Sequence, residues 1–141
     1  MKIEETYGFL FKRINNYLKA CANNDLRPDD LTLIQVDALL MLSSAEKKIM
    51  TMKELEAGLH LAQSTVNGIV SRLEKKNLVV AEGDLSDKRI KVVRISELGE
   101  EKCNAVKARI LETERTLISG LSEKEREQLW ELLQKVCRSC T

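Results

Sequence analysis

The clearest pattern in the chain lies between residues 61 and 96, where the spacing of apolar residues changes from a helical to a strand-like period. In the first half, apolar residues recur at intervals of three and four and form one stripe of a predicted helix: Val66, Ile69, Val70 and Leu73. The opposite side of that helix carries small or hydrogen-bonding residues: Ser64, Asn67, Gly68 and Ser71. Two runs rich in β-branched residues, 78–82 and 90–95, then flank a turn-prone segment at 83–87. These runs predict a β-hairpin with a basic tip.

The residues before this stretch predict helices with defined starts. Apolar residues from Ile3 to Cys21 recur at steps of four and three, a narrow seam that suits packing against another helix, and the helix is expected to end at 23–25. Thr32 and Gln35 have the spacing of a capping box at the start of a second helix, which is expected to end in a loop at 43–48.

A short helix is predicted directly before the one described first. Thr51 and Glu54 have capping-box spacing at its start, and it runs to Leu59. Because only a short turn separates the two helices, they form a predicted helix-turn-helix pair. With the hairpin that follows, the pair predicts a winged helix-turn-helix.

Two more helices are predicted after the hairpin. Ser96 is expected to cap a long helix that Gly120 interrupts, and Ser122 with Glu125 forms a capping box for the last one. The seams at both ends of the chain have no evident partner in so small a fold, so we expect them to build a homodimer. The alternative is that they complete a monomeric core. The predicted fold class is therefore mostly α with a small antiparallel β-hairpin, a winged helix-turn-helix flanked by N- and C-terminal dimerisation helices.

The charge distribution supports contact with a polyanion. The net charge of the 141 residues is only +1. Residues 63–94, however, hold seven basic and four acidic side chains, so the positive excess lies on the helix and hairpin. The longest apolar run, 38–42, is too short to cross a bilayer, and the N-terminus lacks the apolar core of a signal peptide. These features predict a cytoplasmic protein without membrane contact.

The chain lacks the residues that several classes of protein function require. The chain has one histidine, and we find no glycine-rich phosphate loop, paired-carboxylate site or nucleophile–base set, so we expect no enzyme activity, cofactor or metal. An aromatic content of 4% argues against single-stranded nucleic acid, which binds stacking platforms.

Four motifs, in this order and spacing, resemble the MarR family of bacterial winged-helix regulators: Leu31-Thr32-x-x-Gln35, Ser64-Thr65-Val66, Arg72-Leu73-Glu74-Lys75-Lys76 and Asp84-x-x-Asp87-Lys88-Arg89. The resemblance implies three regions: an N-terminal dimerisation helix at 1–30, a winged helix-turn-helix DNA-binding region at 31–96 and C-terminal dimerisation helices at 97–141. It also implies a homodimer on a near-palindromic double-stranded DNA operator, usually a repressor, released by a small, often aromatic, effector. Tyr7, Phe11 and Tyr17 are candidates to line the effector cleft.

The resemblance further implies roles for individual residues. The recognition helix of such proteins enters the major groove, and a wing arginine, here Arg89 beside Lys88, reaches the adjacent minor groove. Asp87 would orient an arginine, and Thr51 would place backbone amides on a phosphate. Arg72 and Lys75 would hold the DNA backbone. Five side chains of the recognition helix would face base edges or nearby phosphates: Gln63, Ser64, Thr65, Asn67 and Ser71.

Two positions depart from the family pattern. Asn77 stands where glycine is usual, but asparagine tolerates the left-handed conformation that ends a helix. Gly68 stands where a longer polar side chain is common. It either allows close approach to DNA or leaves fewer bases read directly.

The four cysteines leave a second mode of regulation open. Cys21 and Cys103 lie on apolar stripes and are expected to act as small hydrophobic residues. Cys137 and Cys140 have the spacing of a redox or metal pair, but no second pair or histidine cluster completes a zinc site. A thiol-based redox sensor using Cys137, Cys140 or Cys21 is therefore one alternative. A winged-helix module that contacts proteins instead of DNA is another.

Overall fold

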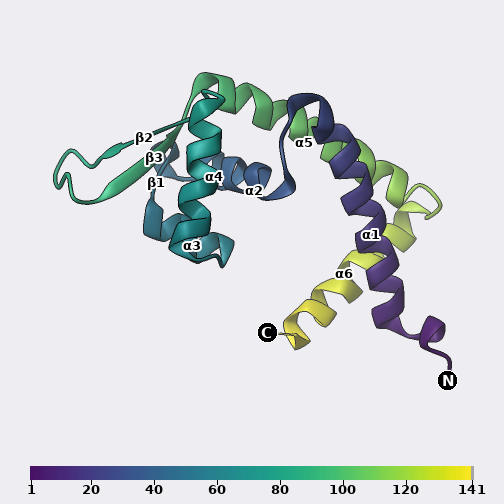
Figure 1. Cartoon of the computed structure of the whole chain (residues 1–141). Coiled ribbons are helices and arrows are strands. Elements are labelled where there is room, and N and C mark those ends of the chain that lie inside the picture. Colours follow the sequence, from purple (N-terminus) through teal and green to yellow (C-terminus); the bar gives the residue numbers. More distant parts are fainter. Residues whose placement is uncertain (141) are drawn as a thin grey trace. The chain divides into compact units, whose positions relative to one another are not determined.

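The structure is a computed structural model that describes residues 1–140, and the chain divides into two compact units, Met1–Ala108 and the segment from Arg109 onward. The predicted fold class is confirmed: the chain is mainly helical with a small antiparallel sheet (Figure 1). The elements follow in the order η1 Ile3–Glu5, α1 Tyr7–Leu26, η2 Arg27–Asp29, α2 Leu33–Ser44, η3 Glu46–Lys48, β1 Ile49–Thr51, α3 Met52–Leu59, α4 Gln63–Lys75, β2 Val79–Gly83, β3 Lys91–Ile95, α5 Glu97–Leu117 and α6 Glu123–Ser139.

The bounds of the first two helices differ from the prediction. The first residues of the seam form the separate 3₁₀ turn η1, and α1 begins at Tyr7 because the Thr6 side chain caps it, accepting a hydrogen bond from the Phe9 amide at 3.2 Å. At its other end α1 continues through 23–25 to Leu26. The predicted capping box of α2 is confirmed. The expected loop at 43–48 is wrong, because α2 extends to Ser44 and η3 follows it.

The sheet has a strand that the sequence pattern did not indicate. β3 lies between β1 and β2 and pairs with both in antiparallel fashion, with Met50 opposite Val93 and Ala81 also opposite Val93. The last residue of β1, Thr51, is also the N-cap of α3. β1 therefore joins the start of the helix-turn-helix pair to the hairpin.

The core of the first unit is built around α2. Leu39 and Leu42 of α2 are at most 1% exposed, and α2 contacts α3, α4 and β3. The entire predicted stripe of α4 is buried: Val66, Ile69, Val70 and Leu73. Because this stripe is fixed against the core, the opposite side of α4 faces solvent.

A set of hydrogen bonds links the end of α4 to the start of α5. Asn77 has φ 60°, as expected, and the amides of Asn77 and Leu78 donate to the carbonyls of Glu74 and Leu73, which is the pattern of a Schellman motif. The Ser96 hydroxyl donates to the Asn77 carbonyl at 2.6 Å and accepts from the Gly99 amide at 3.0 Å, which confirms Ser96 as a helix cap. A Cβ on Gly99 would lie 2.2 Å from the Leu78 carbonyl oxygen, so only glycine fits there.

The second unit contains the end of α5, a turn and α6. The Ser122 hydroxyl accepts from the Glu125 amide at 3.2 Å, and the Glu125 carboxylate accepts from the Ser122 amide at 2.9 Å, so this predicted capping box is confirmed. The bond from the Ser122 amide to the carboxylate is the largest cause of a lowered pKa at Glu125, and the Ser122 side chain is the next. None of the helices in the described part of the chain combines the length and the apolar character needed to cross a bilayer.

Candidate DNA interface

The solvent-facing side of α4 forms a polar face next to the hairpin. All seven of its predicted contact residues are exposed, and we call them the polar face: Gln63, Ser64, Thr65, Asn67, Ser71, Arg72 and Lys75. The side chain of Arg72 extends back along the helix, and its Nη1 lies 3.6 Å from the position that a Cβ on Gly68 would occupy. The Arg72 guanidinium therefore lies beside Gly68, near the middle of the polar face.

Thr51 acts as a cap at the start of α3. Its hydroxyl accepts a hydrogen bond from the Glu54 amide at 3.1 Å, and its side chain is half-buried. The remaining amides at the start of α3 carry the positive end of the helix dipole, which favours anions.

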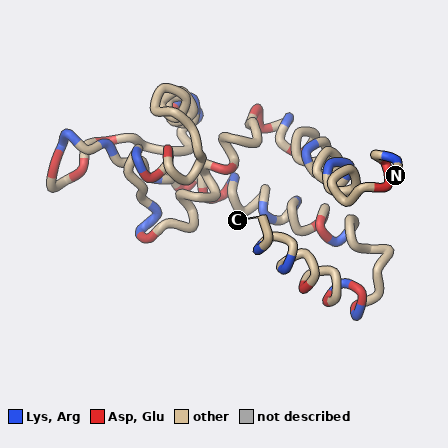
Figure 2. Tube along the Cα trace, turned by 90° about the horizontal axis from the view of Figure 1, so that it is seen from below, with Lys and Arg blue, Asp and Glu red and all other residues tan. Residues whose placement is uncertain are grey.

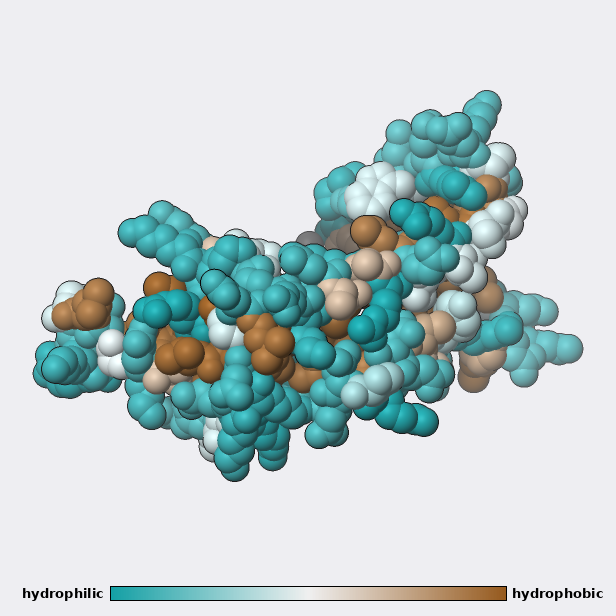
Figure 3. Space-filling model, turned by 90° about the horizontal axis from the view of Figure 1, so that it is seen from above, coloured by the Kyte–Doolittle hydropathy of each residue, from teal (hydrophilic) through white to brown (hydrophobic). Residues whose placement is uncertain are grey.

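The wing consists of β2, the loop 84–90 and β3, and its loop is held by internal hydrogen bonds. The Asp84 amide donates to the Ile90 carbonyl at 2.8 Å, and the Ile90 amide donates to the Asp87 carbonyl at 3.0 Å. Acidic and basic residues meet at the end of the wing (Figure 2). Leu85 is fully exposed, and hydrophobic atoms stand out at the same end of the wing, on the left of Figure 3.

Asp87 orients the Arg89 side chain, as the sequence predicts. Arg89 donates from Nε to one carboxylate oxygen of Asp87 at 3.1 Å, from Nη2 to the other at 3.2 Å, and from its amide at 3.0 Å. The side-chain bonds from Arg89 are the largest cause, and its amide the next, of a lowered pKa at Asp87. The Arg89 side chain remains 91% exposed, so the guanidinium is directed but accessible.

The basic residues of this region fall into two groups. Arg94 is paired with Glu82 across the hairpin, Arg89 with Asp87, and Lys76 with Asp30. Among the residues that the structure describes, the other four basic side chains of 63–94 have no ion pair or side-chain hydrogen bond: Arg72, Lys75, Lys88 and Lys91. These four can give their donors to phosphates at no cost in protein contacts.

Of these four residues, Lys91 is the one that the contacts predicted from the sequence omit. It is exposed at the start of β3, opposite Gly83 of β2, next to the buried pair Val92 and Val93. A lysine within a mostly apolar run that predicts a strand was the signal that could have identified it as outward-facing.

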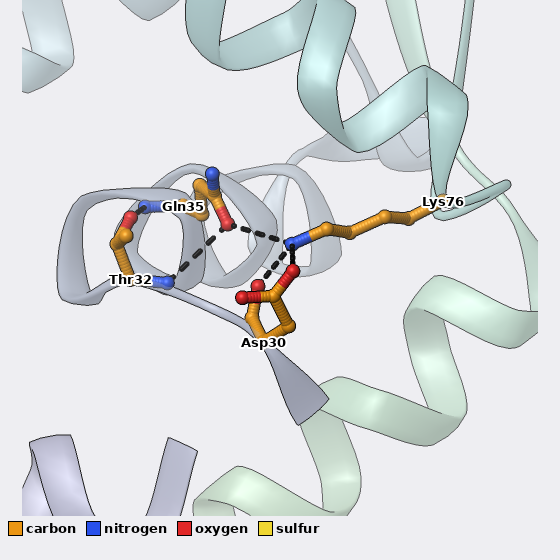
Figure 4. A network of polar contacts seen from close by, with 4 residues as sticks. All are labelled: Asp30, Thr32, Gln35 and Lys76. Atoms are coloured by element: carbon orange, nitrogen blue, oxygen red, sulfur yellow. Dashed lines mark hydrogen bonds and ion pairs between the residues drawn. The ribbon is translucent and has the colours of Figure 1, made fainter. Parts of the chain in front are cut away.

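Lys76 directly follows α4 but belongs to a different set of contacts (Figure 4). Its ammonium donates to the Asp30 carbonyl oxygen and, at 3.4 Å, to the Gln35 side-chain oxygen, and it lies 3.8 Å from the Asp30 carboxylate. The end of α4 is thereby joined to the connection between α1 and α2.

The remaining candidate residues are dispersed. Cys103 is buried, as expected, and burial is the largest cause of its raised pKa. Cys21 is half-buried on α1, and its side chain, one helical turn from Tyr17, is the largest cause of a raised pKa at Tyr17. Cys137 and Cys140 are exposed free thiols at the end of α6. The three aromatic residues proposed for an effector cleft are exposed on α1, to 84% for Tyr7, 41% for Phe11 and 44% for Tyr17.

Known proteins are similar to this chain in sequence and in fold. A family model described as MarR family matches residues 29–90, which run from the end of η2 into the wing. An uncharacterized HTH-type transcriptional regulator of Bacillus cereus is 27% identical over 125 residues, which make up 88% of this chain and 82% of the relative.

Two solved structures of one regulator are similar over nearly the whole chain. MepR, a transcription regulator of the Staphylococcus aureus multidrug efflux pump MepA, is 29% identical, with 96% of this chain and 99% of that chain covered and a TM-score of 0.83. The MepR–DNA complex is similar with 30% identity, 95% and 98% coverage and a TM-score of 0.80.

Proposed function

The chain belongs to the MarR family of DNA-binding transcription regulators, and from this we propose that it binds a near-palindromic operator as a homodimer, acts as a repressor and is released by a small aromatic effector. The observation that carries the proposal is the exposed polar face of α4 next to an accessible, directed wing arginine. A helix of this kind fits the major groove, and an arginine fits the narrower minor groove beside it.

In this proposal the contacts divide by chemistry. Asn67, Gln63, Ser64, Thr65 and Ser71 offer donors and acceptors to base edges or nearby phosphates, since amides and hydroxyls can do both. Lys75, Arg72, Lys88 and the amides at the start of α3, positioned by Thr51, neutralise phosphates. Arg89 enters the minor groove while Asp87 fixes its direction.

Exposed apolar side chains support the homodimer. On α1, Leu10, Phe11 and Ile14 are between 41% and 49% exposed, and on α6, Leu129, Leu132 and Val136, which share one face of the helix, are 37%, 58% and 44% exposed. A contiguous row of such residues is costly in water and marks an interface. We propose that regions 1–30 and 97–141 bury these rows against a second copy of the chain. The spacing of the two α4 helices would then match one turn of DNA, about 34–36 Å.

A salt titration tests DNA binding against the alternative of a protein-contact module. Fluorescence anisotropy with a labelled duplex should show affinity that falls steeply with salt, because each neutralised phosphate releases counterions. Arg89→Ala should flatten the slope of log K against log salt by about 0.9 for each subunit, because a cation in the minor groove also displaces counterions from the phosphates that flank the groove. A protein-contact module would show neither effect.

Thiol oxidation is a second candidate for the release mechanism. It is favoured by the exposure of Cys137 and Cys140, which lie three residues apart at the end of α6. Hydrogen peroxide would oxidise the two thiols to a disulfide and be reduced to water. Operator affinity should then fall on peroxide treatment and be restored by dithiothreitol. If a variant with serine at Cys21, Cys137 and Cys140 responds to peroxide as the parent does, these thiols are not the sensor.

A further inference from the structure

Lys75 and Lys76 are neighbours in sequence but occupy opposite environments. Lys75 is exposed on the polar face and has no side-chain partner among the described residues. Lys76 lies about 100° further around the helix, towards the buried stripe. Its side chain is only 28% exposed, and its ammonium donates hydrogen bonds to the Asp30 carbonyl oxygen and the Gln35 side-chain oxygen, with the Asp30 carboxylate 3.8 Å away (Figure 4). Two of the three donors of the ammonium are therefore used within the protein.

Because Gln35 is buried, its hydrogen bond to Lys76 requires a defined geometry. It is 4% exposed and is the buried polar side chain among residues 1–140. Its oxygen accepts from the Thr32 amide at 3.3 Å as part of the α2 capping box and from Lys76 at 3.4 Å. A hydrogen bond to a charged donor at a buried oxygen is stronger than one at the surface and depends on direction. Apolar packing of the α4 stripe has no such directionality.

The connection between α1 and α2, which contacts Lys76, also forms an ion pair with α5. Asp30, in the left-handed region with φ 52°, follows η2 directly, and its neighbour Asp29 forms an ion pair with Lys102 of α5 at 2.6 Å. Two adjacent residues at the end of the α1–α2 connection thus hold the end of α4 and the first part of α5.

We propose that Lys76 is a positioning residue: it fixes the C-terminal end of α4 to Asp30 and Gln35 and so sets how the polar face is presented to DNA, without contacting DNA itself. This inference rests on the proposed function. It assigns opposite tasks to the adjacent lysines, a phosphate contact to Lys75 and an internal tether to Lys76.

The first test needs no DNA. Amide hydrogen exchange compares the parent with Lys76→Met, which retains the length of the side chain but removes the charge. The amides of Asn77 and Leu78, which donate to carbonyls in the last turn of α4, should exchange about tenfold faster in the variant, because the tether through a charged donor is removed. Amides of α3 should be unchanged. Equal exchange at Asn77 and Leu78 in both proteins would overturn the proposal.

The second test measures affinity for a selected operator and for an unrelated duplex over a range of salt. Lys76→Met should bind the operator about tenfold more weakly, since one charge-assisted contact sets the presentation of α4, with the unrelated duplex and the salt slope unchanged. Lys75→Met should weaken binding to both duplexes and lower the slope by about 1.8, which is about 0.9 for the phosphate that each of the two subunits leaves without its cation. Lys76→Arg, which keeps the charge, should bind the operator almost as tightly as the parent. Lys102→Met removes the neighbouring ion pair and is the matched control; it should leave the ratio of operator affinity to unrelated-duplex affinity unchanged.

The outcomes separate this inference from the proposed function. If the parent binds duplexes but Lys76→Met lowers the salt slope as Lys75→Met does, Lys76 contacts phosphate and the inference is wrong. If the parent shows no salt-dependent binding to any duplex, the proposed function fails and the role in presenting α4 to DNA fails with it. Should Lys76→Met not fold, Lys76→Gln removes the charge and shortens the side chain by one atom while keeping a polar end. A lower ratio of operator to unrelated-duplex affinity then supports the tether, and an unchanged ratio opposes it.

Discussion

At the scale of single residues, the pairing of Asp87 with Arg89 combines direction with access. Three hydrogen bonds fix the arginine, yet its side chain stays almost fully exposed. An exposed pair of this kind adds little stability, because solvent screens it. Its value is that the guanidinium is already directed before DNA arrives, so less conformational freedom is lost on binding.

This pairing predicts a titration. Arg89→Ala should raise the pKa of Asp87 towards its ordinary value, because the Arg89 side-chain bonds are the main cause of its lowering. A carboxylate with a lowered pKa contributes stability above its ordinary pKa and loses it as the pH falls through the lowered value. The Asp87 carboxyl carbon, followed by NMR against pH, gives the result. Lys88→Ala is the control, and an equal shift in that variant would contradict the assignment.

A substitution at Gly68 distinguishes the two alternatives for this residue, close approach of the helix to DNA or fewer bases read directly. Only Arg72 comes within 4 Å of a Cβ built there, at an ordinary contact distance of 3.6 Å. Gly68→Ala should therefore raise the free energy of unfolding by up to about 1 kcal/mol, as for a glycine replaced inside a helix. Chemical denaturation measures that gain. If the glycine serves close approach to DNA, operator affinity falls in the same variant; if it only leaves bases unread, affinity is unchanged.

At the scale of elements, features set by local chemistry were predictable from the sequence. The capping residues Thr32, Ser96 and Ser122, the buried stripe of α4 and the left-handed Asn77 depend on neighbours a few residues away, and all are confirmed. β1 was missed because a three-residue strand shows no period of its own and exists through its pairing with β3. The contact of Lys76 with Asp30 and Gln35 joins residues more than 40 positions apart, so spacing could not indicate it.

The end of α4 gives a prediction at the same scale. Asn77→Ala should lower the free energy of unfolding by about 1–2 kcal/mol, because alanine pays the full cost of the left-handed conformation. Asn77→Gly should be neutral or stabilising, since glycine adopts that conformation freely. Thermal or urea denaturation of both variants measures the difference. Equal destabilisation of the two would mean that the Asn77 side chain, and not its backbone, holds the turn.

At the scale of the whole molecule, the exposed apolar rows of α1 and α6 predict that the chain does not work alone. Leu132→Glu should shift the protein towards monomer in sedimentation velocity runs, because a charge in a buried interface is poorly solvated. Operator affinity should fall with it. Leu85→Glu, a charge at an exposed leucine outside these rows, is the control. A variant at Leu132 that sediments as the parent does would place the interface elsewhere.

The central claim is that two copies of the polar face and wing bind one symmetric DNA site. Selection of bound sequences from a random pool of duplexes tests it most directly. The expected result is an inverted repeat whose half-sites lie about one helical turn, roughly 10 base pairs, apart. A pool without enrichment, or one enriched in a single asymmetric site, would contradict the claim.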